Sequence, residues 1–291
     1  KGHISIWLGT GRDQAQVIWR AIADLFTPKT GITVDVKLVS ASMVEAFLSG
    51  NAPDVSIHVT RETLVNMAIR SALLELSSFE GFSDVIKEFH PEALKPYTYQ
   101  NKVHGLPDTQ TFNMLFYRRD ILNELDIPVP QTWEEFIDAA NKLQLRKLKA
   151  GIPITGDTAS SCSMFYTLLM QYGGSLFNED YSRVALNTPE ALRAFSMWTD
   201  LYVKVGLPVQ YDFFNRFRSG EMPLAVTEYT AYNQLMSAAP ELSGLWEIAP
   251  IPGVGQADGT INRAQPANGT AAVILSSTTN PQAAWKFLEW W

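Results

Sequence analysis

The chain has 291 residues, of which 46% are hydrophobic and 18% are charged, as in ordinary globular proteins. Its formal net charge of −7 argues against a nucleic-acid or anionic-membrane partner, because either would need a basic patch. The single cysteine, Cys162, excludes an internal disulfide. No stretch approaches the ~18 consecutive apolar residues of a membrane-spanning helix. With ~150 residues per domain, the length predicts two domains.

Strands and helices alternate through the first part of the chain. Alternating apolar residues predict the strands, and helical apolar spacing predicts the helices, with Asp13 as the N-cap of the first helix. The predicted strands cover residues 3–8, 32–39 and 54–59, and the predicted helices cover residues 13–30, 42–48 and 61–69. This alternation indicates parallel strands joined by right-handed crossovers.

The stretch 101–122 predicts a passage between two lobes. Residues 102–106 form a predicted strand closed by Pro107, which cannot donate to a sheet ladder and so indicates an edge or an exit. A second predicted strand, 114–117, follows without the Gly or Asn pair of a tight hairpin turn. We therefore expect one extended segment that leaves one sheet and enters another.

The second half of the sequence continues the α/β pattern. Thr132 and Glu135 fit a capping box at the start of a helix. The predicted helices cover residues 132–143, 162–172, 188–205, 213–219, 231–239 and 280–291, and the predicted strands cover residues 152–154, 223–227, 246–251 and 271–275. The last helix ends on Trp290 and Trp291 without a Gly or Asn cap, which predicts a fragment truncated at the C-terminus.

These elements predict an α/β protein with two discontinuous lobes and a cleft between them. Lobe one is predicted at residues 1–108 and 251–291, and lobe two at residues 113–248. The hinge crossings are predicted at residues 109–112 and 249–250, since hinges absorb changes of φ and ψ over a few residues.

Motifs for catalysis are weak in this sequence. The four histidines lack HxH or HExxH spacing, so no metal site is predicted. The loop after the first strand lacks the third glycine of a dinucleotide site, and neither a P-loop nor a GxSxG elbow is present. Asp108 and Glu228 are a possible glycosidase pair, but among thirty acidic residues some pairing is inevitable. We therefore predict no catalytic residue and no cofactor.

Several predicted strands are followed by hydroxyl, amide, charged or aromatic residues. Ligands of open α/β sheets bind beyond the carboxyl ends of the strands. Tyr229 and Tyr232 follow such an end, where an aromatic face can stack on a ligand. Four tryptophans lie within periodic elements and are expected in the core: Trp7, Trp19, Trp133 and Trp198.

Several short segments, taken together, resemble the extracellular solute-binding proteins of sugar-type ABC transporters, the maltose-binding-protein-like family. The matching segments are ISIW (4–7), FTPKTGI (26–32), SGNAPDV (49–55), NKVHGLP (101–107), LFYRRDI (115–121), TWEEF (132–136), YGG (172–174), SGE (219–221) and NPQAAWKFL (280–288). Their order and spacing cover almost the whole chain. The resemblance implies a type II periplasmic-binding-protein-like fold that closes by hinge motion on a solute and delivers it to an ABC permease.

The resemblance also implies where the solute binds. The implied ligand-binding residues are Gly9, Thr10, Gly11, Arg12, Asp13, His58, Thr60, Arg61, Thr109, Gln110, Thr111, Phe112, Ser160, Ser161, Ser163, Glu228, Tyr229, Tyr232 and Asn268. Arg12, Arg61 and Glu228 are expected to hydrogen-bond the solute, and Tyr229 or Tyr232 to stack on it. Thr111 and Thr230 replace an acidic residue and a Trp of the maltose-type pattern, which argues against maltodextrin itself. A mono- or oligosaccharide remains the leading ligand class.

Four functions stay open on the sequence alone. The first is a non-enzymatic, monomeric binding protein outside the cytoplasm, in the periplasm or as a surface lipoprotein whose leader is absent from this sequence, with ABC permease subunits as partners. The second is a binding protein for a polyamine, an anion or a metal complex, although the candidate residues show no excess of carboxylates or convergent N–H groups. The third is a hydrolase or lyase that uses Asp108 and Glu228. The fourth is a sensor or scaffold that feeds no transporter.

Overall fold

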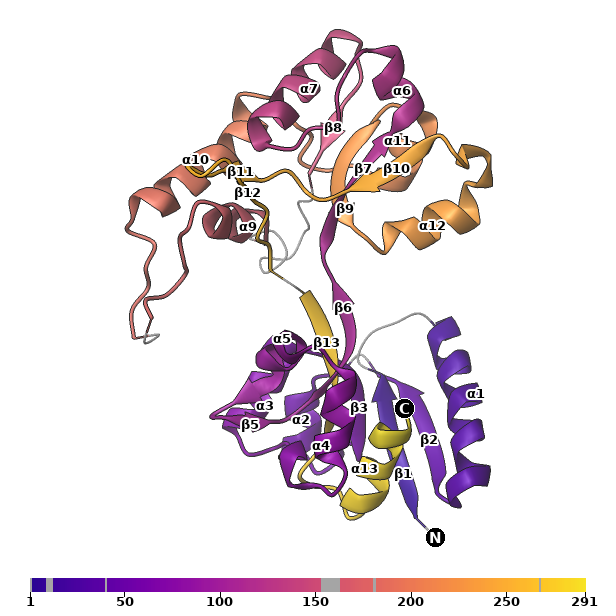
Figure 1. Cartoon of the computed structure of the whole chain (residues 1–291). Helices are drawn as coiled ribbons and strands as arrows, with labels where there is room; N and C mark the ends of the chain where they lie inside the picture. Colours follow the sequence, from indigo (N-terminus) through magenta and orange to yellow (C-terminus); the bar gives the residue numbers. More distant parts are fainter. Residues whose placement is uncertain (1, 9–12, 40, 153–162, 180–181, 267) are drawn as a thin grey trace. The chain divides into compact units, whose positions relative to one another are not determined.

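The computed structural model describes residues 2–8, 13–39, 41–152, 163–179, 182–266 and 268–291 (Figure 1). The chain forms two compact units. Unit 1 comprises Lys1–Gln110 and Asn268–Trp291, and unit 2 comprises Thr111–Ala267. The chain leaves unit 1 within the predicted crossing at 109–112, but it returns at 267–268, later than the predicted crossing at 249–250. The hinge role of these segments stays a prediction.

Unit 1 is built on a five-stranded sheet with the strand order β2-β1-β3-β13-β6. The strands are β1 (His3–Leu8), β2 (Thr33–Leu38), β3 (Val55–Thr60), β6 (Leu106–Thr111) and β13 (Asn268–Ile274). The first three pair in parallel, as the alternating pattern predicts. β13 is antiparallel to β3, because it re-enters the sheet from unit 2 and does not follow a crossover helix.

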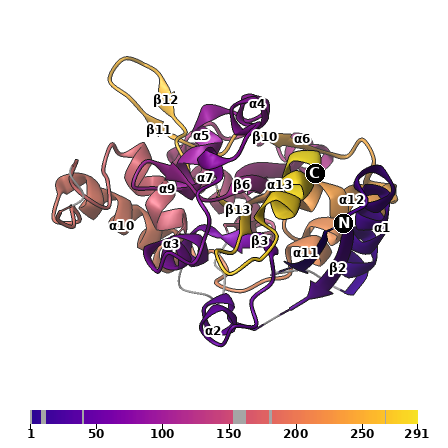
Figure 2. The same ribbon diagram turned by 90° about the horizontal axis from the view of Figure 1, so that it is seen from below.

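Helices cover this sheet and bury its apolar residues. They are α1 (Asp13–Thr30), α2 (Met43–Leu48), α3 (Arg61–Ile69), α4 (Phe82–Val85), α5 (Pro91–Leu94) and α13 (Pro281–Trp290), with short 3-10 turns at Leu76–Ser78, Ile86–Glu88 and Lys95–Tyr97. Figures 1 and 2 show α1 running alongside β2. Phe26 of α1 and Phe287 of α13 are fully buried and meet edge to face, with ring centroids 5.2 Å apart. The apolar stripes of these two helices thus complete the core under β1 and β3.

Pro107 lies inside strand β6, whereas the sequence pattern ends the strand at this residue. β6 stands last in the strand order of its sheet, where a residue without an N–H group breaks no ladder. The preceding residues Lys102–Val103 form β5, which pairs with β4 (Thr98–Tyr99) in a separate two-stranded ladder. Pro107 therefore indicates an edge, one of its two predicted meanings, and the strand continues through it.

Unit 2 contains a four-stranded sheet with the strand order β10-β7-β9-β8. The strands are β7 (Asn113–Arg118), β8 (Ala150–Gly151), β9 (Leu224–Glu228) and β10 (Trp246–Ala249), and Val254–Gly255 (β11) pairs with Ile261–Asn262 (β12). β7 is antiparallel to both neighbours, and only β8 and β9 pair in parallel among the described strands of this sheet. The helices are α6 (Arg119–Glu124), α7 (Trp133–Leu145), α9 (Ser163–Gln171), α10 (Pro189–Val203), α11 (Phe213–Ser219) and α12 (Ala231–Ala238), with a 3-10 turn at Pro240–Leu242.

Alternate residues of β7 enter two different cores. Leu115 packs with Trp133 and Phe136 of α7, whereas Phe116 packs with Phe217 of α11. All of these side chains are fully buried. The period-two alternation of β7 thus attaches helices to both faces of the sheet.

The late return of the chain to unit 1 follows from hydrogen bonds made after β10. Gly253 N donates to Gln131 O (3.0 Å), and Trp133 N donates to Gly253 O (3.2 Å), so this segment binds the start of α7. Gln171 Nε2 donates to Pro252 O (3.2 Å), and Asn262 Nδ2 donates to Gln171 O (3.0 Å). These partners all belong to unit 2, which explains why 251–267 stays there.

The predicted capping box at the start of α7 is confirmed. Glu135 N donates to Thr132 Oγ1 (3.2 Å), and Thr132 N donates to Glu135 Oε2 (3.4 Å). We expect Thr132→Ala to lower the free energy of unfolding by about 1 kcal/mol, because it leaves an N-terminal N–H of α7 without its acceptor. Urea unfolding measures this, and Ser237→Ala, an exposed hydroxyl inside α12, is the control with little expected effect.

Candidate functional site

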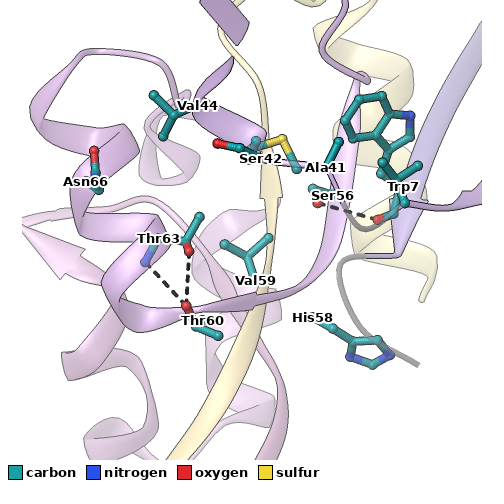
Figure 3. A pocket seen from close by; sticks show the side chains of 12 residues that line it. Trp7, Ala41, Ser42, Val44, Ser56, His58, Val59, Thr60, Thr63 and Asn66 are labelled. Atoms are coloured by element: carbon teal, nitrogen blue, oxygen red, sulfur yellow. Dashed lines mark hydrogen bonds between the residues drawn. The ribbon is translucent and has the colours of Figure 1, made fainter. Parts of the chain in front are cut away.

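A pocket of about 330 Å³ opens in unit 1 at the carboxyl ends of β1 and β3 (Figure 3). It is lined by Trp7, Val39, Ala41, Ser42, Met43, Val44, Ser56, His58, Val59, Thr60, Thr63 and Asn66. Trp7 comes from β1, Ser56 and His58 come from β3, and Thr63 comes from the first turn of α3. This is where open α/β sheets place their ligands.

The described lining of the pocket combines polar and apolar groups. Its described lining residues include hydroxyl, amide, indole and imidazole groups, but none is Asp, Glu, Lys or Arg. Thr60 Oγ1 caps α3 by accepting from Thr63 N (3.3 Å), and Ser56 Oγ donates to Trp7 O (3.4 Å). Such a lining suits a neutral, hydroxyl-rich ligand that needs both hydrogen bonds and apolar contact.

His58 stands at the edge of this pocket and contacts a buried carboxylate. Its backbone N–H donates to Asp108 Oδ2 (2.7 Å), and its Nδ1 lies 3.5 Å from the same oxygen. The side chain of Asp108 is 2% exposed and that of His58 is 20% exposed. The Thr270 hydroxyl donates to Asp108 Oδ1, and it lies 2.6 Å from the Thr109 hydroxyl. The pKa of the neighbouring Tyr97 is raised to about 12, mainly because the hydroxyl is buried and secondly because of the negative charge of Asp108.

Unit 2 has an aromatic cluster of its own, next to the end of β9. Phe112 and Tyr229 stack with ring centroids 4.8 Å apart at 21°, and Tyr229 N donates to Phe112 O (3.0 Å). Phe112, Tyr229 and Tyr232 are 39%, 36% and 43% exposed, so their rings are accessible in this unit. An exposed aromatic face can stack on the apolar surface of a ligand while nearby polar groups hydrogen-bond it.

A second, shallower pocket of about 400 Å³ lies between α12 and β10. It is lined by Tyr232, Met236, Ser243, Gly244, Trp246, Glu247 and Ile248. The rings of Tyr232 and Trp246 meet edge to face, 5.6 Å between centroids at 66°. Tyr232 therefore lines this pocket, and its backbone N–H donates to Tyr229 O (3.0 Å), next to the stacked pair.

Comparison with known proteins gives the family. The family model described as bacterial extracellular solute-binding protein matches residues 21–291. The chain belongs to this family. It is 22% identical over 239 residues to the putative ABC transporter periplasmic-binding protein YcjN of Escherichia coli K12. The alignment covers 76% of this chain and 53% of YcjN. The chain thus spans about half the length of that relative.

Solved structures of solute-binding proteins share this fold. A solute-binding protein from Thermotoga lettingae bound with α-D-tagatose has a TM-score of 0.80 and 25% identity, covering 100% of this chain and 76% of that one. The maltose-bound MalE3 of Thermotoga maritima has a TM-score of 0.79 and 21% identity, and the match covers 99% of this chain and 76% of MalE3. The predicted two-lobed, periplasmic-binding-protein-like fold class is therefore confirmed.

The predicted site residues of this solute-binding protein fall into three groups. Six of them lie outside the described residues: Gly9, Thr10, Gly11, Arg12, Ser160 and Ser161. Three more are described only as the first residues of α1, α9 and β13, namely Asp13, Ser163 and Asn268. In unit 1, His58 and Thr60 line the pocket, and Thr109 and Gln110 are the last two residues of the unit's first segment. Arg61 is exposed, and its Nη2 lies 3.2 Å from Glu62 Oε1. In unit 2, Phe112 and Tyr229 form the stacked pair, and Thr111, Glu228 and Tyr232 are near these two residues in the sequence.

Sequence reasoning missed several pocket residues of the solute-binding protein. Trp7 is expected in the core, and it does pack against buried residues, but it also lines the pocket. Ser42, Thr63 and Asn66 were not candidates. The sequence could have indicated two of these residues, because Trp7 is next to the end of a strand and Ser42 caps a helix. Asn66 lies within α3, where no local pattern marks it as a pocket residue.

The described residues give no support for a metal site or a membrane span in this solute-binding protein. No group of three His, Cys, Asp or Glu side chains gathers among them to hold an ion. None of the described helices has both the length and the apolar character that crossing a bilayer requires. Cys162 lies outside the described residues.

Proposed function

We propose that this chain is a non-enzymatic binding protein for a neutral carbohydrate. The observation that carries the proposal is the unit 1 pocket, whose described lining offers hydroxyl, amide, indole and imidazole groups and no Asp, Glu, Lys or Arg. The exposed rings of Phe112, Tyr229 and Tyr232 in unit 2 give a second stacking surface. The sugar ligands of the tagatose-bound and maltose-bound solved structures support the same ligand class.

We propose further that the protein acts outside the cytoplasm, in the periplasm or at the cell surface, as a monomer, and hands its solute to an ABC permease. The family description and the periplasmic-binding relative from E. coli support this role. The chain itself contributes the binding step, and transport across the membrane belongs to the permease.

Two observations weigh against the other candidate functions. A polyamine site needs several carboxylates, and none lines the described part of the unit 1 pocket. A hydrolase would need Asp108 as a free acid or base, but Asp108 is buried and both of its oxygens accept hydrogen bonds within unit 1. A general acid or base must reach the proton that it transfers, whereas both oxygens of Asp108 already contact residues of unit 1.

Isothermal titration calorimetry tests the proposal. The panel consists of maltose, acarbose, D-tagatose and cycloalternan, with spermidine and phosphate as charged comparison solutes. We expect one-to-one binding of at least one sugar and no heat from spermidine or phosphate. Chromatography of the bound sugar after prolonged incubation is expected to return it unaltered. Binding of spermidine or phosphate alone, or conversion of the sugar, would overturn the proposal.

The role of the pocket has its own expected result. Trp7→Leu keeps apolar bulk against the core but removes the aromatic face, so we expect the dissociation constant of the bound sugar to rise about tenfold. The matched variant Phe177→Leu changes an exposed aromatic outside both pockets, and its dissociation constant should equal that of the unmodified chain. Equal constants for both variants would place the solute elsewhere.

A further inference from the structure

Strand β3 contains a bulge at His58. Val59 is opposite Ala271 and Ser56 is opposite Val273, so Ile57 and His58 together face the single residue Ala272 of β13. A bulge leaves the backbone of its extra residue outside the ladder, and it turns a side chain to a new direction. The β3–β1 pairing ends at Ile57, immediately before this point.

His58 has a backbone conformation that favours glycine. Its φ is 60°, in the left-handed region, although it carries a β-carbon. This conformation is uncommon for a residue with a β-carbon, and contacts with surrounding residues can offset its cost. The contact that holds His58 must therefore be found among its neighbours.

Asp108 supplies that contact from another strand. β13 lies between β3 and β6 in the sheet, so the Asp108 carboxylate reaches past β13 to accept from His58 N at 2.7 Å. The second oxygen of Asp108 accepts from the Thr270 hydroxyl, which fixes the carboxylate in place.

We propose that Asp108 is a positioning residue for the solute pocket. Its carboxylate holds the His58 peptide in the left-handed conformation, and the bulge then keeps the imidazole at the pocket edge, where it contacts the solute. The consequence for solute binding rests on the proposed function, whereas the effect of Asp108 on the conformation of His58 does not. The competing explanation is that Asp108 only ties β6 to β13 through Thr270, with no effect on His58.

Thermal unfolding of the full chain without solute separates the two explanations. The variants are Asp108→Ala, His58→Gly and the double variant, with Asp108→Asn in place of Asp108→Ala if the latter does not fold. We expect Asp108→Ala to lower Tm by about 3–6 °C. In the His58→Gly background the same change should lower Tm by less than half as much, because glycine adopts this φ without support. Equal losses in both backgrounds would overturn the proposal.

Chemical labelling reports the His58 side chain directly. Diethyl pyrocarbonate modification, read for each histidine by peptide mass spectrometry, should be several-fold faster at His58 in Asp108→Ala than in the unmodified chain. His3 and His90 are exposed and serve as internal controls with unchanged rates. Thr270→Val, which removes the other partner of Asp108, should change the His58 rate less than Asp108→Ala does. An unchanged His58 rate in Asp108→Ala would overturn the proposal.

Titration with maltose, acarbose and D-tagatose links the positioning role to binding. For a sugar that binds, Asp108→Ala and His58→Gly should each raise the dissociation constant about tenfold, and the double variant should be no weaker than His58→Gly. A further loss in the double variant would overturn the link. If no sugar binds while the unfolding and labelling results hold, the carbohydrate function fails and the positioning role of Asp108 stands.

Discussion

Replacing Trp133 by Phe is expected to lower the free energy of unfolding of unit 2 by about 2 kcal/mol, although an aromatic ring remains. Trp133 is fully buried, and its Nε1 donates to Gln171 Oε1 at 2.7 Å. Gln171 is also fully buried, and its Nε2 donates to Pro252 O (3.2 Å). Phe cannot donate, so the Gln171 oxygen would lose its partner in a place that water does not reach.

The matched control for this prediction is Trp198→Phe. Trp198 Nε1 is a buried donor without a hydrogen-bond partner among the described residues, so its loss leaves no acceptor unpaired. We expect Trp198→Phe to cost less than Trp133→Phe, and Trp133→Ala to cost about 4 kcal/mol through the cavity it creates. Urea unfolding followed by circular dichroism, with hydrogen exchange of the α7 amides to report unit 2, measures all three. Equal costs for the two Phe variants would show that the Gln171 contact contributes nothing.

Replacing Arg118 by Met is expected to lower the free energy of unfolding by about 3 kcal/mol. The Arg118 side chain is 10% exposed, and it binds Asp120 through two bonds, Nε to Oδ1 (2.9 Å) and Nη2 to Oδ2 (2.6 Å). Its Nη1 donates to the Phe217 and Arg218 carbonyls at 3.2 and 3.3 Å, at the C-terminal end of α11. Met keeps the apolar stem but leaves the carboxylate and both carbonyls without this donor.

Two further measurements sharpen the Arg118 prediction. Arg218→Met is the control: it removes an exposed partner of Glu241, and surface pairs of this kind stabilise a protein by only about 0–1 kcal/mol.

Burial raises the pKa of the Asp120 carboxyl, but the hydrogen bonds and charge of Arg118 outweigh it and hold that pKa below its ordinary value. This contribution to stability is therefore present at neutral pH and is lost as pH falls through the lowered pKa of folded Asp120. Acid should destabilise the Arg118→Met variant less than the unmodified chain.

Local signals in the sequence predict those elements whose ends are fixed by near neighbours. The helices Arg61–Ile69 and Phe213–Ser219 have the predicted bounds, because Thr60 and Asp212 cap their first turns through side-chain oxygens. Gly220, with φ 83°, ends the second of these helices. Such interactions span three or four residues, so a single sequence contains all the information they need.

Pairings between distant residues were not predictable in the same way. Trp246 pairs with Arg118 across 128 positions, and this pairing places β10 in unit 2. His58 and Asp108 are fifty positions apart, and Asp108 was a candidate acid in the sequence because nothing local shows that both its oxygens are occupied. The bulge at His58 likewise arises from the register of β13 against β3, which side-chain patterning within β3 does not encode.

The described lining of the unit 1 pocket contains no Asp, Glu, Lys or Arg, and this has a consequence for the kinetics with which the proposed neutral sugar is captured. An electric field exerts no net force on a neutral sugar, so the net charge of −7 neither attracts nor repels it. The rate of encounter is then set by diffusion and by solute concentration. Affinity and encounter rate should both be nearly independent of ionic strength, because dissolved salt screens only interactions between charges.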